Sequence, residues 1–316
     1  MNEMRTALVL GATGGVGGEI ARALLGRGWA VRVLARDPAK LSGLGFECVK
    51  GDAMVRGEVI AAAEGARIIV HAVNPPGYRN WGKLVVPMLD NTIAAAEKGS
   101  ARIVFPGTVY NYGPDAGAVL TESSPQHPVT RKGQLRVTME RRLADSAASG
   151  TTKSLIVRCG DYFGPRAANN WFSQGLVRPG RAVRRIVYPG PFEVGHAWAY
   201  LPDVGETFAR LLDREDALKP FELFHMRGAW LEPGVEMAYA IRRAVGRDVP
   251  IGKLPWTMLR LLAPFNETLR EMMEVRYLWQ RPLRLDNTKL NAFLGQEPFT
   301  PLDRAISATL SALGCT

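Results

Sequence analysis

Residues 6–37 read TALVLGATGGVGGEIARALLGRGWAVRVLARD, and this stretch decides the fold. It contains an apolar run over 7–10, a glycine-rich turn, an amphipathic run over 20–25 and a second apolar run over 30–35. The apolar runs predict buried strands, and the amphipathic run predicts a helix between them. Strand, tight loop, helix and strand in this order are typical of the first βαβ unit of a dinucleotide-binding domain. A dinucleotide is therefore the expected ligand class.

The glycines of the turn are spaced Gly11-x-x-Gly14-x-x-Gly17. A pyrophosphate is expected at the start of the following helix, where free N–H groups and the helix dipole favour negative charge. Glycine has no Cβ to hold the phosphates away, and it also permits positive φ. An ordinary glycine-rich turn is the alternative, but the flanking strand and helix favour a cofactor loop. The predicted loop residues are Gly11, Thr13, Gly14, Gly15, Val16 and Gly17.

The end of the second apolar run bears on the type of nicotinamide cofactor. An acidic residue there bonds the adenosine 2′-hydroxyl of NAD, whereas an arginine suits the 2′-phosphate of NADP. Residues 33–38 read VLARDP, so Ala35 stands where the acidic residue is usual and Arg36 follows it. We therefore predict NADP. NAD is the alternative if Arg36 is a solvated side chain and Asp37 reaches the ribose.

The composition of the 316-residue chain, with 47% hydrophobic residues, is that of a globular protein. No run reaches the roughly 18 apolar residues of a membrane span, and the first strand begins so early that no signal peptide is expected. Cys48, Cys159 and Cys315 lie too far apart for a disulfide framework or a zinc site, so we expect a cytoplasmic protein without a metal. The net charge of +10 accompanies no nucleic-acid-binding motif, so we expect it to serve an anionic small molecule, or solubility alone. Neither nucleic acid nor a membrane is an expected partner.

Strand and helix patterns alternate through the first half of the chain. Strands are expected over 47–50, 67–73, 102–105 and 154–157, and helices over 59–63, 84–98 and 134–148. This alternation predicts an α/β fold with a doubly wound parallel sheet of the Rossmann type. After residue 165 prolines and glycines become frequent, and helices are expected over 204–212, 237–245 and 302–313. We therefore expect a dinucleotide-binding domain over 1–165 and a smaller substrate-binding region over 166–316 that partly returns to the main domain.

Further motifs stand in an order that is typical of one family. They are Gly51-Asp52, His71-Ala72-Val73-Asn74, RCGDYFGPR at 158–166, YLPDV at 200–204, LDNTKL at 285–290 and Leu294-Gly295. With the glycine loop, they make nearly the whole chain resemble the extended and atypical short-chain dehydrogenase/reductase superfamily, the NAD-dependent epimerase/dehydratase group. The resemblance implies that Asp52 approaches the adenine and that Ala72 and Asn74 lie beneath the cofactor. Asp161 stands where the R-x-x-N-x-Y-G-P segment of that family usually has asparagine.

In this family a Ser or Thr, a Tyr and a Lys four residues later carry out the chemistry. The resemblance places Thr108 at the hydroxyl position. Aligning the Glu-Arg pair at 140–141 with the family's helix puts Lys132 at the tyrosine position and Arg136 at the lysine position, and no tyrosine lies between residues 112 and 162. Arg136 can hold the cofactor ribose, but arginine is a poor acid. The candidate proton donors are Lys132, Tyr110, Tyr112 and Tyr162.

The segment after residue 165 carries polar side chains that the resemblance places beside a substrate. Asparagine offers a donor and an acceptor, an aromatic ring stacks on planar groups, and an arginine fork suits a diphosphate. Four arginines lie between 178 and 185, although a solvated basic loop is the alternative. His196 is a candidate proton carrier, with a structural histidine as the alternative. The predicted substrate residues are Asp161, Arg166, Asn170, Trp171, Arg184 and His196.

Two functions compete on these residues. The first is an NAD(P)-dependent oxidoreductase or epimerase-like enzyme that moves a hydride between nicotinamide and a polar substrate, either a nucleotide sugar or another carbonyl compound. The second is a non-catalytic dinucleotide sensor, because the chain also resembles the regulators of nitrogen metabolite repression. The enzyme is favoured because Thr108 is retained and the elaborate segment over 165–200 would be costly to order without a small ligand. The family resemblance further implies a homodimer that pairs the helices at 84–98 and 134–148.

Overall fold

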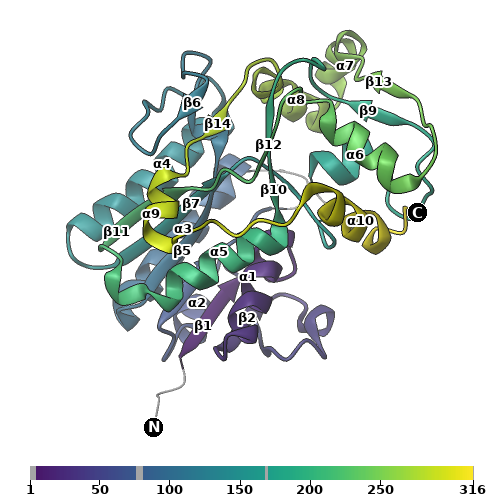
Figure 1. Ribbon diagram of the computed structural model, residues 1–316. Helices are drawn as coiled ribbons and strands as arrows, with labels where there is room; N and C mark the ends of the chain where they lie inside the picture. Colours follow the sequence, from purple (N-terminus) through teal and green to yellow (C-terminus); the bar gives the residue numbers. More distant parts are fainter. Residues whose placement is uncertain (1–4, 76–80, 168–169, 316) are drawn as a thin grey trace.

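Seven parallel strands form the centre of the molecule in the order β3-β2-β1-β4-β5-β7-β11 (Figure 1). The computed structural model describes residues 5–75, 81–167 and 170–315. The sheet grows outward from β1 in both directions, so the chain order reverses between β1 and β4. The strands are β1 (Thr6–Leu10), β2 (Ala30–Ala35), β3 (Glu47–Lys50), β4 (Ile68–His71), β5 (Arg102–Thr108), β7 (Lys153–Cys159) and β11 (Phe221–His225).

Helices cover both faces of this sheet. Helices α1 and α5 pack against each other on one face, and α2, α3 and α4 pack in sequence on the other. Their bounds are α1 (Gly15–Gly26), α2 (Arg56–Ala62), α3 (Trp81–Gly99), α4 (Arg131–Ala148) and α5 (Leu201–Asp213).

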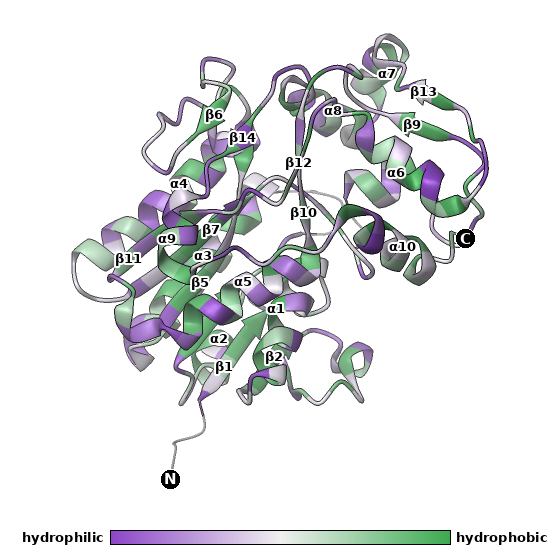
Figure 2. Ribbon diagram, in the orientation of Figure 1, coloured by the Kyte–Doolittle hydropathy of each residue, from purple (hydrophilic) through white to green (hydrophobic). Residues whose placement is uncertain are grey.

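The inner strands β1 and β4 are almost entirely apolar because both of their faces are buried. In β1, Ala7 and Val9 join the core beneath α1 and α5, whereas Leu8 and Leu10 join the core beneath α2, α3 and α4. All four residues are fully buried. Figure 2 shows the hydrophobic colouring on the central strands. The prediction of a doubly wound parallel sheet is therefore confirmed.

A smaller lobe with its own hydrophobic core is built from segments that lie before and after β11 in the chain. Its strands are β8 (Asp161–Phe163), β10 (His196–Tyr200) and β12 (Ala229–Leu231) in one sheet, and β9 (Ile186–Tyr188) and β13 (Ile251–Lys253) in another. Its helices are α6 (Glu236–Val245), α7 (Trp256–Leu262), α8 (Glu267–Glu274) and α10 (Leu302–Ala312). A third pair joins β6 (Val119–Leu120) to β14 (Arg284–Leu285), and α9 (Thr288–Leu294) packs against β11.

Short helical turns complete the fold. They are η1 (Pro38–Leu41), η3 (Val109–Asn111), the π-helix η4 (Phe172–Leu176), η5 (Glu215–Ala217), η6 (Ala263–Phe265) and η7 (Arg276–Trp279).

The observed boundaries differ from the predicted ones where local hydrogen bonds decide. The helix expected from residue 134 begins at Arg131, because the Thr130 hydroxyl accepts the Gly133 N–H at 3.0 Å and caps it. The strand expected to end at 105 continues to Thr108, because it pairs with β7 along that length. Within the described part of the chain, no helix has the length and apolar character needed to cross a membrane.

Candidate active site

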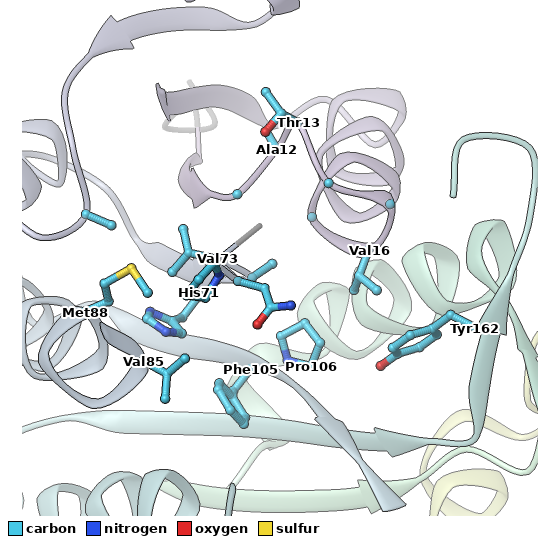
Figure 3. A pocket seen from close by; sticks show the side chains of 18 of the residues that line it. Ala12, Thr13, Val16, His71, Val73, Val85, Met88, Phe105, Pro106 and Tyr162 are labelled. Atoms are coloured by element: carbon cyan, nitrogen blue, oxygen red, sulfur yellow. The ribbon is translucent and has the colours of Figure 1, made fainter. Parts of the chain in front are cut away.

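A cavity of about 640 Å³ opens at the carboxyl ends of β1, β4 and β5. It lies at the point where the strand order reverses, which is where open α/β sheets bind ligands. Figure 3 shows Thr13 and Val16 of the glycine loop on one side of this pocket and Phe105, Pro106 and Tyr162 on the other. The pocket therefore joins the two predicted halves of the site, the cofactor loop and the reacting end.

The glycine loop adopts the shape that a pyrophosphate requires. Gly11 has a φ of +93°, and a Cβ on it would lie 2.5 Å from the carbonyl oxygen of Ala72. A Cβ on Gly17 would lie 2.4 Å from the carbonyl oxygen of Gly11. Gly14 is the N-cap of α1 and supplies no side-chain hydrogen bond, and no acidic residue stands in the first turn. The N–H groups at this helix start therefore suit a phosphate, so the loop fits the pyrophosphate of a dinucleotide.

The end of the cavity beside β2 carries two cations. Arg36 is exposed at the cavity wall, where Lys40 also lines it, and Lys40 pairs with Asp37 at 3.5 Å. Asp52 lines the same end, and its carboxylate accepts the Met54 N–H at 2.9 Å. The sequence did not identify Lys40, which lies in η1 just after the loop that carries Arg36.

Three polar side chains converge on the carboxyl end of β5. The Thr108 hydroxyl lies at the cavity wall and accepts the N–H of Tyr110 at 3.3 Å. The Tyr162 hydroxyl donates to the carbonyl of Gly107 at 3.0 Å, and Nη1 of Arg136 donates to the carbonyl of Pro106 at 3.3 Å. These contacts fall on three consecutive residues, so the three functional groups share one corner of the pocket.

The electrostatic environment of this corner is set by burial and by Arg136. Burial raises the pKa of the Tyr162 hydroxyl well above its usual range, and Arg136 partly opposes that shift. The Arg136 guanidinium lies 5.3 Å from the ring centre of Trp81 and 5.4 Å from that of Phe105, which are cation–π distances. Its Nε has no hydrogen-bond partner among the described residues.

His71 at the end of β4 is a cavity residue for which the sequence suggested no role. Its Nδ1 lies 2.7 Å from the Thr92 hydroxyl, and its Nε2 has no partner in the described structure. Burial first, and Arg136 second, lower the pKa of His71 to about 3. The imidazole is therefore neutral at physiological pH.

The remaining predicted cofactor residues also line the cavity. Ala72 and Asn74 follow β4, and the Trp81 indole N–H donates to Oδ1 of Asn74. Tyr110 lines the wall beside Thr108.

Two of the candidate proton donors do not reach the cavity wall. Lys132 is 5% exposed, and its ammonium pairs with the Glu271 carboxylate at 2.8 Å. Tyr112 is fully buried, and its hydroxyl bonds Arg158 at 2.5 Å and His225 at 2.8 Å. Both side chains are therefore engaged in the packing around the site.

The predicted substrate residues divide into two groups. Asp161 and Asn170 line the cavity, although the Asn170 amide oxygen also accepts the Ser173 N–H at 2.8 Å. His196 lies behind Asp161, with its Nε2 2.7 Å from the carboxylate and its ring stacked on Trp279 at 3.8 Å.

The other three predicted substrate residues lie off the cavity wall. Trp171 packs against the Trp279 ring in the smaller lobe, and Arg166 pairs with Glu19 of α1 at 2.8 Å. Arg184 is exposed and precedes β9. Of the predicted substrate residues, the structure therefore places Asp161 and Asn170 on the cavity wall and places Trp171, Arg166 and Arg184 away from it.

The strand order, the glycine loop and the cavity at the switch point define a dinucleotide-binding protein of the Rossmann class. The chain belongs to the NAD dependent epimerase/dehydratase family, whose model matches residues 7–226. This match confirms the family resemblance that the sequence motifs indicated.

The individual proteins that resemble this chain share less than a third of its residues in the matched regions. The chain is 29% identical over 170 residues to the dTDP-6-deoxy-L-talose 4-dehydrogenase (NAD(P)(+)) of Kitasatospora kifunensis, and the match spans 49% of this chain and 52% of that protein. The match therefore covers about half the length of this curated relative. The crystal structure of gox2253 superposes with a TM-score of 0.77 at 20% identity, covering 99% of this chain and 100% of the other. The UDP-glucose-4-epimerase of Stenotrophomonas maltophila, solved with NAD and formylated UDP-arabinopyranose, superposes with a TM-score of 0.78 at 15% identity, covering 98% of each chain.

Proposed function

We propose that this protein is an NADP-dependent oxidoreductase or epimerase-like enzyme whose substrate is a nucleotide sugar or another polar carbonyl compound. The observation that carries the proposal is the convergence of Thr108, Tyr162 and Arg136 on three consecutive residues of β5, in the same cavity as the glycine loop. A protein that only binds a dinucleotide does not need a hydroxyl, a phenol and a cation grouped together in this part of the cavity.

The chain's own residues would hold the cofactor at three places. The N–H groups at the start of α1 would hold the pyrophosphate, Arg36 and Lys40 would hold the 2′-phosphate, and the Arg136 guanidinium would hold the nicotinamide ribose. When bound, the nicotinamide ring supplies the hydride donor or acceptor. The preference for NADP follows from these two cations at the adenosine end.

The reacting end would manage the proton of the substrate hydroxyl. The Thr108 hydroxyl polarises the substrate oxygen, and the Tyr162 phenol donates or accepts the proton. The raised pKa of Tyr162 keeps the phenol protonated in the resting site, and Arg136 lowers the cost of forming a phenolate. Tyr162 is preferred over Lys132 because the Lys132 ammonium is held by Glu271.

The substrate would lie between this corner and the smaller lobe. Asp161 faces the cavity, and His196 holds its carboxylate from behind at 2.7 Å. A carboxylate fixed in this way can accept a hydrogen bond from a sugar hydroxyl. The named activity of the Kitasatospora kifunensis relative, a sugar 4-dehydrogenase, and the UDP-sugar bound to the Stenotrophomonas maltophila epimerase support this substrate class.

A calorimetric titration with NADPH and NADH tests the cofactor assignment. We expect NADPH to bind more tightly than NADH. In the double variant Arg36→Ala/Lys40→Ala, each lost charge-assisted contact should cost about 2 kcal/mol of binding free energy, roughly thirtyfold in NADPH affinity for each contact. NADH binding should change little. Arg142→Ala, an exposed arginine of α4 that is paired with Asp90, is the matched control. Equal binding of both cofactors by the wild type would remove Arg36 as a selector.

A substrate screen then tests the chemistry. NADPH consumption, or NADP⁺ reduction, is followed with nucleotide sugars and small carbonyl compounds. Thr108→Val and Tyr162→Phe should each lower kcat at least about a hundredfold while cofactor affinity is retained. Retained turnover in both variants would contradict the assigned roles.

A dinucleotide sensor is the second candidate, and one observation favours it. Helix α4 contains no tyrosine, and Lys132, which stands at the tyrosine position, is paired with Glu271. The sensor predicts tight cofactor binding without hydride transfer to any substrate, together with a protein partner that binds one redox form. Substrate-dependent NADPH turnover would exclude it.

A further inference from the structure

Asp161 and His196 form a hydrogen-bonded pair on the small sheet of β8, β10 and β12, which stands between the main sheet and the rest of the smaller lobe (Figure 1). Asp161 of β8 pairs in register with Trp198 of β10, and His196 lies two residues before Trp198 on the same strand. Side chains two residues apart point to the same face of a strand. The pairing of β8 with β10 therefore places the aspartate and the histidine on one face of the small sheet.

The carboxylate is the accessible end of this pair. The His196 ring is stacked on the Trp279 ring, with 3.8 Å between the ring centres and an interplanar angle of 6°. Trp279 is 2% exposed and the His196 side chain 8%, whereas the Asp161 side chain is 16% exposed and Asp161 lines the cavity. The two rings therefore form a buried backing, and the carboxylate is the group that a ligand can contact.

The contact with His196 determines which chemistry the carboxylate offers. An ionised carboxylate only accepts hydrogen bonds, so Nε2 of His196 carries the hydrogen of its 2.7 Å contact with Oδ2 of Asp161. Among the described residues, no lysine or arginine forms an ion pair with Asp161. A ligand group at this point must therefore be a hydrogen-bond donor, such as a hydroxyl or an amino group. A second carboxylate would bring two like charges together in a half-buried site, where water screens them poorly.

We propose that Asp161, positioned by His196, is a specificity-determining residue that admits substrates with a hydroxyl or amino group at this point and excludes substrates with a carboxylate there. This role rests on the proposed function, and it narrows the substrate class to neutral or amino-bearing sugars and hydroxy-carbonyl compounds. Arg136 would favour the opposite charge. Its guanidinium, however, lies at the carbonyl of Pro106, in the corner assigned to the reacting group and the nicotinamide ribose.

Two matched pairs of compounds test this role with the full chain. UDP-glucose and UDP-glucuronic acid differ by a hydroxymethyl group against a carboxylate, and D-glyceraldehyde and tartronate semialdehyde differ in the same way. Turnover is followed by the absorbance of NADPH, and binding to the NADP⁺ complex is followed by calorimetry. We expect the wild type to favour the neutral member of a pair by about a hundredfold, because juxtaposed like charges cost several kcal/mol. Asp161→Asn keeps the shape and loses the charge, so the preference should fall below about tenfold.

A further variant and a matched control separate the positioning role of His196 from the charge of Asp161. His196→Phe keeps an aromatic ring against Trp279 but removes the N–H that holds the carboxylate. We expect the KM of the neutral substrate to rise about tenfold while kcat changes by less than about threefold. Asp115→Asn is the control, because Asp115 forms the same kind of pair with His127 at 2.8 Å on the surface, and it should keep the wild-type preference. Circular dichroism and thermal unfolding confirm that each variant is folded.

Two results would overturn this role for Asp161. The first is a wild type that favours neither member of either pair, or that favours the acid, and the second is an Asp161→Asn variant that keeps the wild-type preference. Turnover without a preference would leave the proposed function standing and would contradict the role of Asp161 alone. Preferential binding of the neutral members without any turnover would contradict the proposed function and support the role of Asp161. An NADP⁺ complex that binds none of the four compounds would contradict both.

Discussion

Gly17 shows at the scale of one residue why the loop sequence is restricted. A methyl group there would press into the carbonyl of Gly11, because its Cβ would lie 2.4 Å from that oxygen. We expect Gly17→Ala to cost about 1–3 kcal/mol of unfolding free energy and to weaken NADPH binding, since the loop must shift away from the helix start. Urea unfolding and calorimetric titration measure both effects.

Gly26 gives the matched control in the same helix. Nothing lies within 4 Å of a Cβ placed on it, so Gly26→Ala should be neutral or should stabilise the fold by up to about 1 kcal/mol. NADPH affinity should not change. If Gly17→Ala binds NADPH as tightly as Gly26→Ala does, the close contact does not shape the cofactor loop.

Single residues also mark how far the sequence could predict the site. The glycine loop and Arg36 were predictable because their signal lies within 32 consecutive residues, from 6 to 37. The position of Lys132 was not, because its partner Glu271 lies 139 residues away in the chain. The same holds for His196, whose partner Asp161 is 35 residues away on another strand of the small sheet. A contact between residues that are far apart in the chain leaves no local sequence pattern from which it could be predicted.

At the scale of elements, α4 is joined to β7 by a buried ion pair. Nη2 of Arg158 lies 2.5 Å from a Glu140 oxygen, and the two side chains are 1% and 6% exposed. We expect Glu140→Gln to cost about 3–5 kcal/mol, because it leaves the Arg158 cation buried without a counter-charge. Thermal and urea unfolding measure the loss.

The matched control lies on the same helix. Arg142 pairs with Asp90 at 2.6 Å, but both side chains are more than 40% exposed. Arg142→Gln should therefore change stability by less than about 0.5 kcal/mol. Similar losses in Glu140→Gln and Arg142→Gln would show that the buried pair has no special role in fixing α4 to the sheet.

The elements themselves were predicted unevenly, for a physical reason. The inner strands of the main sheet were predictable because they are buried on both faces and read as continuous apolar runs, such as 7–10 and 68–70. The edge strand β11 was not predicted. The short strands β8, β10 and β12 pair with partners far along the chain, so no local pattern fixed them. Helix α7 was not predicted, and its large apolar side chains point to solvent instead of marking a buried face.

At the scale of the whole molecule, two buried histidines couple folding to pH. Burial first, and a nearby arginine second, lower the pKa of His71 to about 3 and that of His225 to about 4. In the unfolded chain both titrate near pH 6.5. Between these values the unfolded state binds more protons than the folded state, so acid favours unfolding. The contribution of these two neutral histidines to the unfolding free energy is complete above about pH 6.5, and it is lost as the pH falls toward 4.

We expect the unfolding free energy to fall below pH 6.5 by up to about 1.4 kcal/mol per pH unit for each of these histidines. Urea unfolding at pH 7.5, 6 and 5 measures the slope. His71→Gln and His225→Gln should each make the slope shallower by about one proton, whatever they cost in packing, because glutamine does not titrate. His127→Gln removes an exposed histidine and should leave the acid loss in place. If His71→Gln and His225→Gln both kept the wild-type slope, the two imidazole rings would not be neutral in the folded state. The electrostatic effect of Arg136 on His71 would then be contradicted as well.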